Sequence, residues 1–210
     1  MKFDPTLYLV TDSYDYTEEE FLRRIEAALQ GGVTLLQMRE KHKSTREYMA
    51  LAEKVHAVTK RYDVPLIIDD RLDVAMAIDA EGVHLGQSDL PVGIARSILG
   101  PDKIIGATTK NVPQALEAYE QGADYLGVGA MYPTTTKVVT VLTAPETLDE
   151  ICHAVPIPAN AIGGLNKDNL SILKGIPVAG ICVVTAIMKA ADPKRAAEEL
   201  LEAFAALKEQ

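Results

Sequence analysis

Three polar residues spaced two apart, Gln37, Arg39 and Lys41, are the first in the chain whose types and spacing suggest chemistry. They follow an apolar run after a glycine pair, a pattern typical of a buried strand. On an extended backbone their side chains point to one side, whereas Met38 and Glu40 point to the other. An arginine grips two oxygens at once and a lysine adds a mobile charge, so the trio predicts a phosphate or diphosphate site. The alternative is a solvated strand end whose charges pair with nearby acids.

The elements that must position this trio form a regular series along the chain. Eight short apolar runs begin near residues 7, 35, 65, 82, 103, 124, 157 and 179, and segments with a helical pattern alternate with them. Runs that are nearly all apolar are expected when both faces of a parallel sheet are covered. Eight such units fit a closed barrel, so we predict a single TIM-barrel domain over residues 1–210. A doubly wound open sheet is the rival, weakened because no Gly-x-Gly-x-x-Gly turn follows the first run.

Local signals mark where several helices begin and end. Thr17 and Glu20, and likewise Ser44 and Glu47, have the spacing of a capping box. The second box predicts a helix that continues to about residue 60. A short helix is expected over residues 168–174. The loop at residues 130–144 is the longest connection, so we expect it to be functional or mobile and to act as a lid.

Composition excludes several classes of function. The chain has 210 residues and a net charge of −9, with dispersed basic residues, so a nucleic-acid-binding face is not expected. No apolar run is long enough to span a membrane, and the start lacks a signal-peptide core. Cys152 and Cys182 are isolated, without metal-ligand spacing, and Cys182 is expected to be a small core residue. We therefore expect a cytoplasmic protein whose partners are small molecules, with homo-oligomerisation possible.

In a barrel the carboxyl ends of all strands meet at one face, where ligands bind. The predicted strand ends and the loops after them bring to this face Gln37, Arg39, Lys41, Asp69, Asp70, Asp89, Thr108, Thr134, Thr135, Thr136, Lys137, Gly163, Gly164, Val184 and Thr185. Acids on two strands, with no histidine at ligand spacing, suit Mg²⁺, whose shell is completed by water and substrate phosphates. The glycine pair follows the seventh strand, where barrels often bind a monophosphate through backbone N–H groups. These residues predict two anionic ligands, one of them a magnesium-bound diphosphate.

Each of these residues also has a structural alternative. Asp70 could form a surface ion pair with Arg71 or cap the third helix, and Asp89 could cap the helix that begins near residue 91. Lys137 could be merely solvated, and the glycine pair could be only a tight turn. His84, in the middle of a strand, is expected to be a satisfied barrel residue rather than a catalyst.

The chain resembles the thiamine-phosphate synthase family over essentially its whole length. The matching segments are residues 7–12 (LYLVTD), 37–41 (QMREK), 82–91 (GVHLGQSDLP), 122–129 (GADYLGVG), 133–137 (PTTTK) and 161–164 (AIGG). The resemblance implies a barrel that joins hydroxymethylpyrimidine diphosphate to thiazole phosphate, giving thiamine phosphate and diphosphate. It further implies that Mg²⁺ is held by Asp70 and Asp89.

The resemblance also assigns the substrate contacts. The pyrimidine diphosphate would be held by Gln37, Met38, Arg39, Glu40, Lys41 and Lys137, and the thiazole phosphate by Thr134, Thr135, Thr136, Gly164, Val184 and Thr185. Departure of the diphosphate needs its charge neutralised, which Arg39, Lys41 and Lys137 would do together with the metal, and no enzyme nucleophile is required.

The chain departs from the family pattern at a few positions. Asp69 stands where the family usually has Asn in contact with the pyrimidine diphosphate, and Thr108 and Thr185 stand where it usually has Ser. In the threonine loop, Thr135 replaces a proline, and Val138 follows Lys137. Two alternative functions stay open, a thiazole tautomerase-like relative that shares the barrel and a non-catalytic protein that binds thiamine precursors. The departures at Asp69 and Val138 leave room for the second. A tautomerase-like relative would tend to lose the diphosphate and metal residues, which this chain retains.

Overall fold

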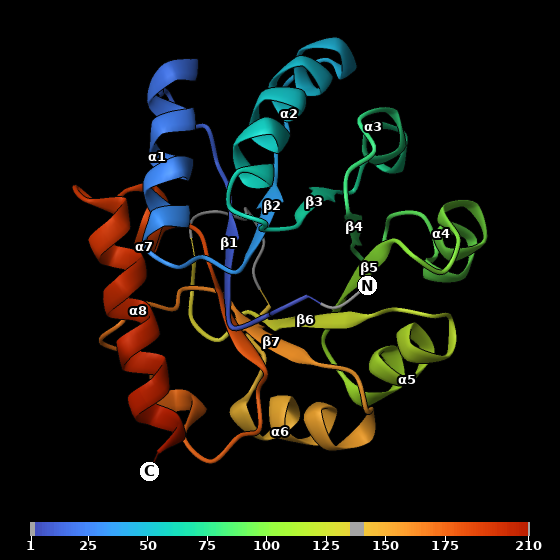
Figure 1. Ribbon diagram of the computed structural model, residues 1–210. Coiled ribbons are helices and arrows are strands. Elements are labelled where there is room, and N and C mark those ends of the chain that lie inside the picture. The colour runs from blue at the N-terminus through green and yellow to red at the C-terminus, as the bar shows by residue number, and fades with distance from the viewer. Residues whose placement is uncertain (1–2, 135–140, 210) are drawn as a thin grey trace.

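The computed structural model describes residues 3–134 and 141–209, and its eight strands form one closed parallel barrel in sequence order (Figure 1). The strands are β1 (Leu7–Val10), β2 (Leu35–Met38), β3 (Leu66–Asp69), β4 (Gly82–Leu85), β5 (Ile104–Thr109), β6 (Tyr125–Gly129), β7 (Ala159–Ile162) and β8 (Gly180–Val183). The last strand pairs with the first, with Tyr8 opposite Cys182. The predicted TIM barrel is confirmed.

Helices follow the strands and surround the barrel. They are α1 (Glu18–Gln30), α2 (Thr45–Lys60), α3 (Leu72–Ala77), α4 (Val92–Leu99), α5 (Val112–Glu120), α6 (Pro145–Ala154), the 3₁₀ helix η1 (Leu170–Leu173), α7 (Thr185–Met188) and α8 (Pro193–Lys208). The helix expected over residues 168–174 is thus only one 3₁₀ turn, and α7 was not foreseen. Within the described ranges, no helix has both the length and the apolar character that crossing a bilayer requires.

The two predicted capping boxes differ in outcome. Ser44 accepts a hydrogen bond from the Glu47 amide, and the Glu47 carboxylate accepts one from the Ser44 amide, so the second box is complete. Thr17 accepts from the Glu20 amide, but the Glu20 carboxylate pairs with arginines one turn further along α1. The first box therefore forms only in half, because charged partners compete for its glutamate.

Alternation along each strand divides the core into two layers. Inside the barrel lies one buried cluster, formed by Tyr8, Val10, Leu35, Ile67, Ile104, Tyr125 and Cys182. The opposite faces of the same strands pack against the helices in a larger cluster that includes Leu7, Leu9, Leu36, Met38, Ile68 and Val83. Because successive side chains point to opposite faces, inward residues near the strand ends are the ones that can reach the open end of the barrel.

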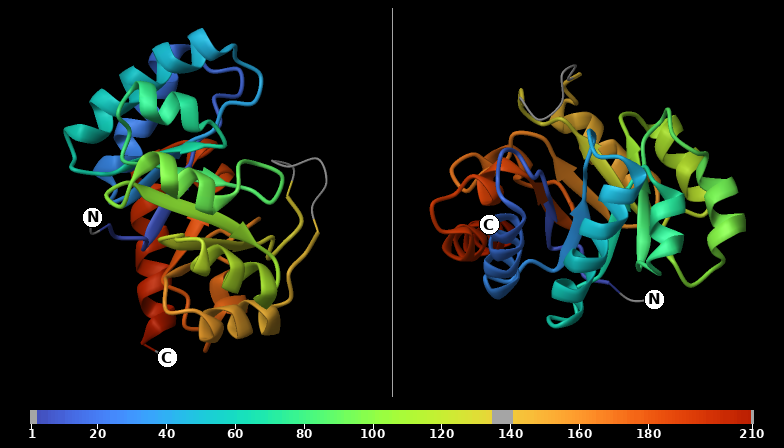
Figure 2. Two further views of the ribbon diagram at one scale, coloured as in Figure 1. Left: turned by 90° about the vertical axis from the view of Figure 1, so that its right-hand side faces the viewer. Right: turned by 90° about the horizontal axis from the view of Figure 1, so that it is seen from above.

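The first and last helices close the ring of helices. In Figures 1 and 2, α8 (red) lies beside α1 (blue), and Arg24 of α1 donates hydrogen bonds to the carbonyl oxygens of Met188 and Ala190. A Cβ at Gly31 would overlap the Lys194 carbonyl oxygen, so glycine at the end of α1 permits this close approach. The ends of the chain thereby hold β1 and β8 together.

Candidate active site

A cavity of about 560 Å³ opens at the carboxyl ends of the strands, and we call it the mouth cavity. The predicted site residues that line it are Gln37, Arg39, Lys41, Asp69, Asp70, Asp89, Thr108, Thr134, Gly163, Gly164, Val184 and Thr185. Residues from all eight strands or the loops after them thus meet at one place, as the barrel prediction required. Thr135, Thr136, Lys137 and Val138 lie outside the described residues, as does the middle of the predicted lid.

The side chains at the end of β2 point alternately into and away from the mouth cavity, as the sequence predicted. Gln37, Arg39 and Lys41 all line the mouth cavity. Met38 is fully buried on the other face, in the core between strands and helices, and its carbonyl oxygen accepts a hydrogen bond from Tyr48. The side chain of Met38 therefore does not reach the mouth cavity. The contact with the pyrimidine diphosphate that the resemblance implies for Met38 is not supported through its side chain.

Glu40 also points away from the mouth. Its Oε2 accepts a hydrogen bond from the Ser13 hydroxyl at 2.9 Å and lies 3.8 Å from the Lys43 ammonium. Burial raises the pKa of the Glu40 carboxyl, against the lowering effect of Ser13. A substrate contact through this carboxylate is therefore not supported, since alternation carries it to the outer side of β2.

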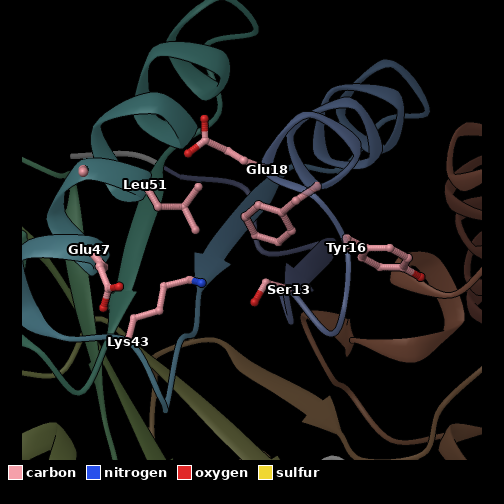
Figure 3. Close-up of a pocket in the computed structure, with 8 residues that line it drawn as sticks. Ser13, Tyr16, Glu18, Lys43, Glu47 and Leu51 are labelled. Carbon is pink, nitrogen blue, oxygen red and sulfur yellow. The ribbon is translucent and has the colours of Figure 1, made fainter.

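Ser13 and Lys43 belong to a second, smaller space, which we call the lateral hollow. It has a volume of about 280 Å³, lies between α1 and α2, and is lined by Ser13, Tyr16, Glu18, Phe21, Lys43, Glu47, Ala50 and Leu51 (Figure 3). Figure 3 shows the Lys43 ammonium pointing toward Ser13. Two nearby lysines, Lys41 and Lys43, thus serve separate spaces on the two sides of β2.

An ion-pair cluster joins the ends of β2 and β3 in the mouth cavity. The Lys41 ammonium lies 2.9 Å from Asp69 Oδ2 and also pairs with Asp70 Oδ2, while Arg39 Nε lies 3.7 Å from Asp69 Oδ2. The Asp69 side chain is 11% exposed. Burial and the neighbouring Asp70 raise the pKa of Asp69 to about 6, although Lys41 and Arg39 act to lower it. The departure from the family pattern at Asp69 is thus accommodated beside basic neighbours.

The structure excludes the capping role considered for Asp70. Its backbone has φ of 59°, a left-handed conformation that Asp tolerates better than most residues. The third helix has Arg71 at its N-cap without a side-chain hydrogen bond, and Arg71 pairs with Asp73 instead. Burial acts to raise the pKa of Asp70, but Lys41 outweighs it, so the pKa lies below its usual value. Asp70 is thus a charged carboxylate held at the mouth.

Asp89 comes from the loop after β4 and meets Asp70. Asp89 Oδ2 accepts a hydrogen bond from the Gly86 amide at 2.7 Å, and the carboxyl group lies near enough to Asp70 for the two groups to shift each other's pKa. Burial raises the pKa of Asp89, opposed by the Gly86 amide and reinforced by the charge of Asp70. Helix α4 has Pro91 at its N-cap with no side-chain hydrogen bond, so Asp89 does not cap it.

This carboxylate pair fits a magnesium ion in its donor chemistry. Nowhere in residues 3–134 or 141–209 do three or more His, Cys, Asp or Glu side chains form a group that could hold a metal. Mg²⁺ requires less, since one or two carboxylates with water and substrate phosphates complete its shell. A divalent cation bound between Asp70 and Asp89 would relieve the mutual repulsion that contributes to the raised pKa of Asp89.

The opposite side of the mouth cavity is formed by the ends of β7 and β8. Gly163 and Gly164 have φ of 103° and 67°, conformations that favour glycine. A Cβ at Gly163 would overlap the Ala130 Cβ, so the turn also needs glycine for space. Val184 is the N-cap of α7, which begins at Thr185. This wall presents backbone and hydroxyl groups rather than charges.

His84 is fully hydrogen-bonded, as expected of a barrel histidine. Its Nε2 lies 2.9 Å from the Thr108 hydroxyl and its Nδ1 lies 3.0 Å from the Tyr125 hydroxyl. Burial lowers the pKa of His84 to about 4, against the raising effect of Asp70. The ring is therefore neutral near pH 7.

Sequence reasoning missed several residues that line the mouth cavity, namely Tyr8, Gln87, Ser88 and Lys110. Gln87 donates to the Thr108 carbonyl oxygen at 2.7 Å and so holds the end of β5. Lys110 lies two residues beyond Thr108, the same spacing that linked Gln37 to Arg39, so the period of two could have found it. Tyr8 was missed because it lies within an apolar run, where the sequence gives no sign that its hydroxyl has a role.

Comparison with known proteins agrees with this geometry. A family model described as thiamine monophosphate synthase matches residues 7–187. A thiamine-phosphate synthase 2 of Streptococcus pneumoniae is 52% identical over 186 residues, which is 89% of each chain. A thiamine-phosphate synthase of Methanobrevibacter smithii is 48% identical over 203 residues, 97% of each chain.

Solved structures show the same likeness. A thiamine phosphate pyrophosphorylase from Pyrococcus furiosus superposes with a TM-score of 0.85 at 40% identity, covering 96% of both chains. A 3-hexulose-6-phosphate synthase shares only the fold, with a TM-score of 0.70 at 18% identity. The extent and identity of these matches show that the chain belongs to the thiamine-phosphate synthase family of TIM-barrel transferases.

Proposed function

We propose that the protein condenses hydroxymethylpyrimidine diphosphate with thiazole phosphate to give thiamine phosphate and diphosphate in a magnesium-dependent reaction. The observation that carries this proposal is that two bases and two neighbouring acids line one cavity. Arg39 and Lys41 supply positive charge beside the Asp70–Asp89 pair, which suits a diphosphate and its cation together. The family membership supports the same reaction.

The balance of charges in the mouth cavity supports the proposed metal. Among the described residues that line the mouth cavity, the three bases Arg39, Lys41 and Lys110 face the three acids Asp69, Asp70 and Asp89. A diphosphate brings further negative charge into a site whose own charges already cancel. Asp70 and Asp89 would hold Mg²⁺, which when bound neutralises phosphate oxygens and stabilises the departing diphosphate.

The side chains of β2 act on the leaving group and on the pyrimidine. Arg39 would bind phosphate oxygens through its guanidinium, and Lys41 would stabilise the negative charge that develops on the bridging oxygen as the diphosphate leaves. The reacting carbon loses diphosphate to give a stabilised pyrimidine cation, so no nucleophilic side chain is required. Gln37 and Thr108 line the same cavity and would hold the ring. Lys137, which lies outside the described residues, is expected to assist.

The wall formed by β7 and β8 would bind the second substrate. Gly164, Thr134, Val184 and Thr185 line the cavity and offer amide and hydroxyl groups to a monophosphate. Thr135 and Thr136 are proposed contacts that lie outside the described residues. Holding the thiazole nitrogen in line with the pyrimidine carbon is then the main contribution of this wall.

The decisive test measures diphosphate release with both substrates and Mg²⁺ in the wild type and two lysine variants. Lys41→Ala should lose turnover by roughly a hundredfold or more, as removal of one preorganised charge stabiliser does. Lys43→Ala is the matched control, because Lys43 faces the lateral hollow and should leave turnover unchanged. Binding of the substrates without any diphosphate release in the wild type would favour a non-catalytic precursor-binding protein instead.

The cellular compartment and the oligomeric state of the protein are also part of this proposal. A biosynthetic enzyme with small-molecule substrates is expected in the cytoplasm, and self-association into a homo-oligomer stays a prediction. Light scattering at two protein concentrations would test the second.

A further inference from the structure

A continuous chain of hydrogen bonds crosses the interior of the barrel beneath the mouth cavity. Gln37 Nε2 donates to the Tyr8 hydroxyl at 2.5 Å, and the Tyr8 and Tyr125 hydroxyls lie 2.6 Å apart. The Tyr125 hydroxyl lies 3.0 Å from His84 Nδ1, and His84 Nε2 lies 2.9 Å from the Thr108 hydroxyl. The two end residues, Gln37 and Thr108, both line the mouth cavity. The chain thus links two cavity residues on different strands, β2 and β5, through groups buried below them.

The backbone leaves space for this chain where side chains would fill it. A Cβ at Gly106 of β5 would overlap Tyr125 Cζ and lie 2.5 Å from His84 Nδ1. A Cβ at Gly127 of β6 would lie 3.2 Å from His84 Cε1. Tyr125 also packs edge-on against the ring of Tyr8, with centroids 5.6 Å apart. The glycines therefore let the Tyr125 hydroxyl and the His84 ring meet in the barrel centre.

Counting donors and acceptors shows that every hydrogen bond in this series donates in the same direction, from Gln37 toward Thr108. The amide nitrogen of Gln37 only donates, so Tyr8 accepts from it and has its own hydrogen left for Tyr125. Tyr125 then donates to His84 Nδ1, and the neutral ring carries its proton on Nε2, which donates to Thr108 Oγ1. The reverse order would leave the Tyr8 hydrogen buried without an acceptor, which is costly. The Thr108 hydrogen is then the one left over, and it can point into the cavity.

The direction also agrees with the charges around the chain. Both ring nitrogens of His84 face hydroxyl groups rather than a carboxylate, so a charged imidazole would be buried without a direct ion pair, and the attraction of Asp70 does not outweigh burial. With Nε2 donating to Tyr8, Oε1 is the amide atom left for the mouth cavity, which Arg39 and Lys41 also line, and this orientation of the amide dipole is favourable there. A flipped amide would reverse every step and require the proton on His84 Nδ1.

We propose that Tyr8, Tyr125 and His84 are positioning residues, which together hold the Gln37 amide with its oxygen toward the mouth and the Thr108 hydroxyl free to donate into it. A ligand ring in the mouth then needs an N–H donor facing Gln37 and an acceptor facing Thr108. The donor pattern of the site is thus set from below, through Tyr125, which does not line the cavity, and through Tyr8 and His84 at its floor. The direction of the chain is a property of the ligand-free protein, whereas its effect on substrate rests on the proposed function.

The first test reads the direction of the chain without any substrate. Long-range ¹H–¹⁵N NMR spectra of ¹⁵N-histidine-labelled protein near pH 7.5 report which nitrogen of each ring is protonated, and His84→Gln identifies the His84 signals. We expect His84 to carry its proton on Nε2, with Nδ1 as acceptor. Protonation on Nδ1 would overturn the proposal, because the Gln37 amide would then face the mouth with its nitrogen. This outcome does not depend on what reaction the protein catalyses.

The second test asks whether Tyr125 acts through Gln37. Tyr125→Phe removes the hydroxyl in the middle of the chain and keeps the ring, so we expect the KM for the pyrimidine diphosphate to rise about tenfold with kcat changed about twofold or less. The KM for thiazole phosphate should not change. In a Gln37→Ala background the same replacement should add nothing to KM, because the amide it orients is gone.

A residue that only packs the barrel would give different results. Its loss would raise KM equally in both backgrounds, and that additivity would overturn the positioning role, as would an unchanged KM in Tyr125→Phe. If Tyr125→Phe does not fold, Tyr8→Phe breaks the chain one step nearer to Gln37 and carries the same expectations. Absence of turnover in the wild type would contradict the proposed function alone, leaving the tautomer measurement to decide the direction of the chain.

Discussion

Replacing Asp69 by asparagine is the sharpest perturbation of this site, because it restores the residue type that the resemblance implies for this position. Asp69 lies 2.9 Å from the Lys41 ammonium, and its pKa is raised by burial to about 6. Near pH 7 it is mostly charged and repels an incoming diphosphate. The substituted amide would keep an oxygen for Lys41 but would carry no charge, so Asp69→Asn should bind the pyrimidine diphosphate at least as well as the wild type.

The raised pKa sets an upper limit on the size of this effect. Repulsion cannot cost more than protonating Asp69 first, which at a pKa of about 6 is roughly 1.4 kcal/mol at pH 7 and roughly 2.7 kcal/mol at pH 8. The improvement in KM is therefore at most about tenfold at pH 7 and about a hundredfold at pH 8. Below pH 6 the carboxyl is protonated, the repulsion disappears, and wild type and variant should converge.

The assay measures KM for the pyrimidine diphosphate at pH 5.5, 7 and 8, at fixed Mg²⁺ and saturating thiazole phosphate. Asp73→Asn is the matched control, since Asp73 pairs with Arg71 outside the mouth cavity and should show no pH-dependent gain. A gain for Asp69→Asn that is the same at all three pH values would refute the charge argument. Loss of turnover with the fold intact would instead give Asp69 a role of its own.

Three further predictions follow from the metal site, the buried histidine and the barrel glycine. Asp70→Ala and Asp89→Ala should each lower turnover about a hundredfold or more while thiazole phosphate binding, measured by calorimetry, changes little; an equal loss of both would argue against a metal role. His84 has a pKa lowered to about 4, so the unfolded chain binds a proton near pH 6.5 and the folded one does not; stability should fall by up to about 3 kcal/mol as the pH drops from 6.5 to 4, and His84→Gln should flatten this dependence in urea titrations. Gly106→Ala should destabilise the barrel by about 1–3 kcal/mol through overpacking, whereas Gly93→Ala in α4, whose Cβ would meet only atoms at 3.6 Å or beyond, should be neutral or stabilising in thermal unfolding.

Much of the barrel could be predicted because local and global signals agree in this chain. Apolar runs with helical segments between them leave few arrangements other than a closed parallel sheet. The same regularity placed Gln37, Arg39 and Lys41 on one side of β2, since alternation continues past the last ladder residue. Prediction succeeded where one periodic rule governed the geometry.

Prediction was weaker in two situations. In one, several side chains compete for the same carboxylate. In the other, a segment that matches the family contains residues that point to both faces of a strand. The capping glutamate of α1 was taken by Arg23 and Arg24, which a residue pattern alone does not rank against a cap. Met38 and Glu40 belong to the segment 37–41 that matches the family, but their side chains face the outer side of β2. A match to the family motif therefore does not show that a side chain contacts the substrate. Asp70 was correctly predicted at the mouth, but its ion pair with Lys41, which comes from another strand, could not be read from the local sequence.

The hydrogen-bond chain beneath the mouth could not be read from the sequence, because each member has an ordinary local explanation. Tyr8 and Tyr125 look like strand residues of an apolar core, and both are indeed buried in it. Their hydroxyls matter only because β1 and β6, on different sides of the barrel, bring them 2.6 Å apart. A buried hydroxyl must find a partner, and the one available to Tyr125 beyond Tyr8 is His84. The polarity of the ligand site is therefore a consequence of barrel closure, and it appears only when residues distant in sequence are placed in three dimensions.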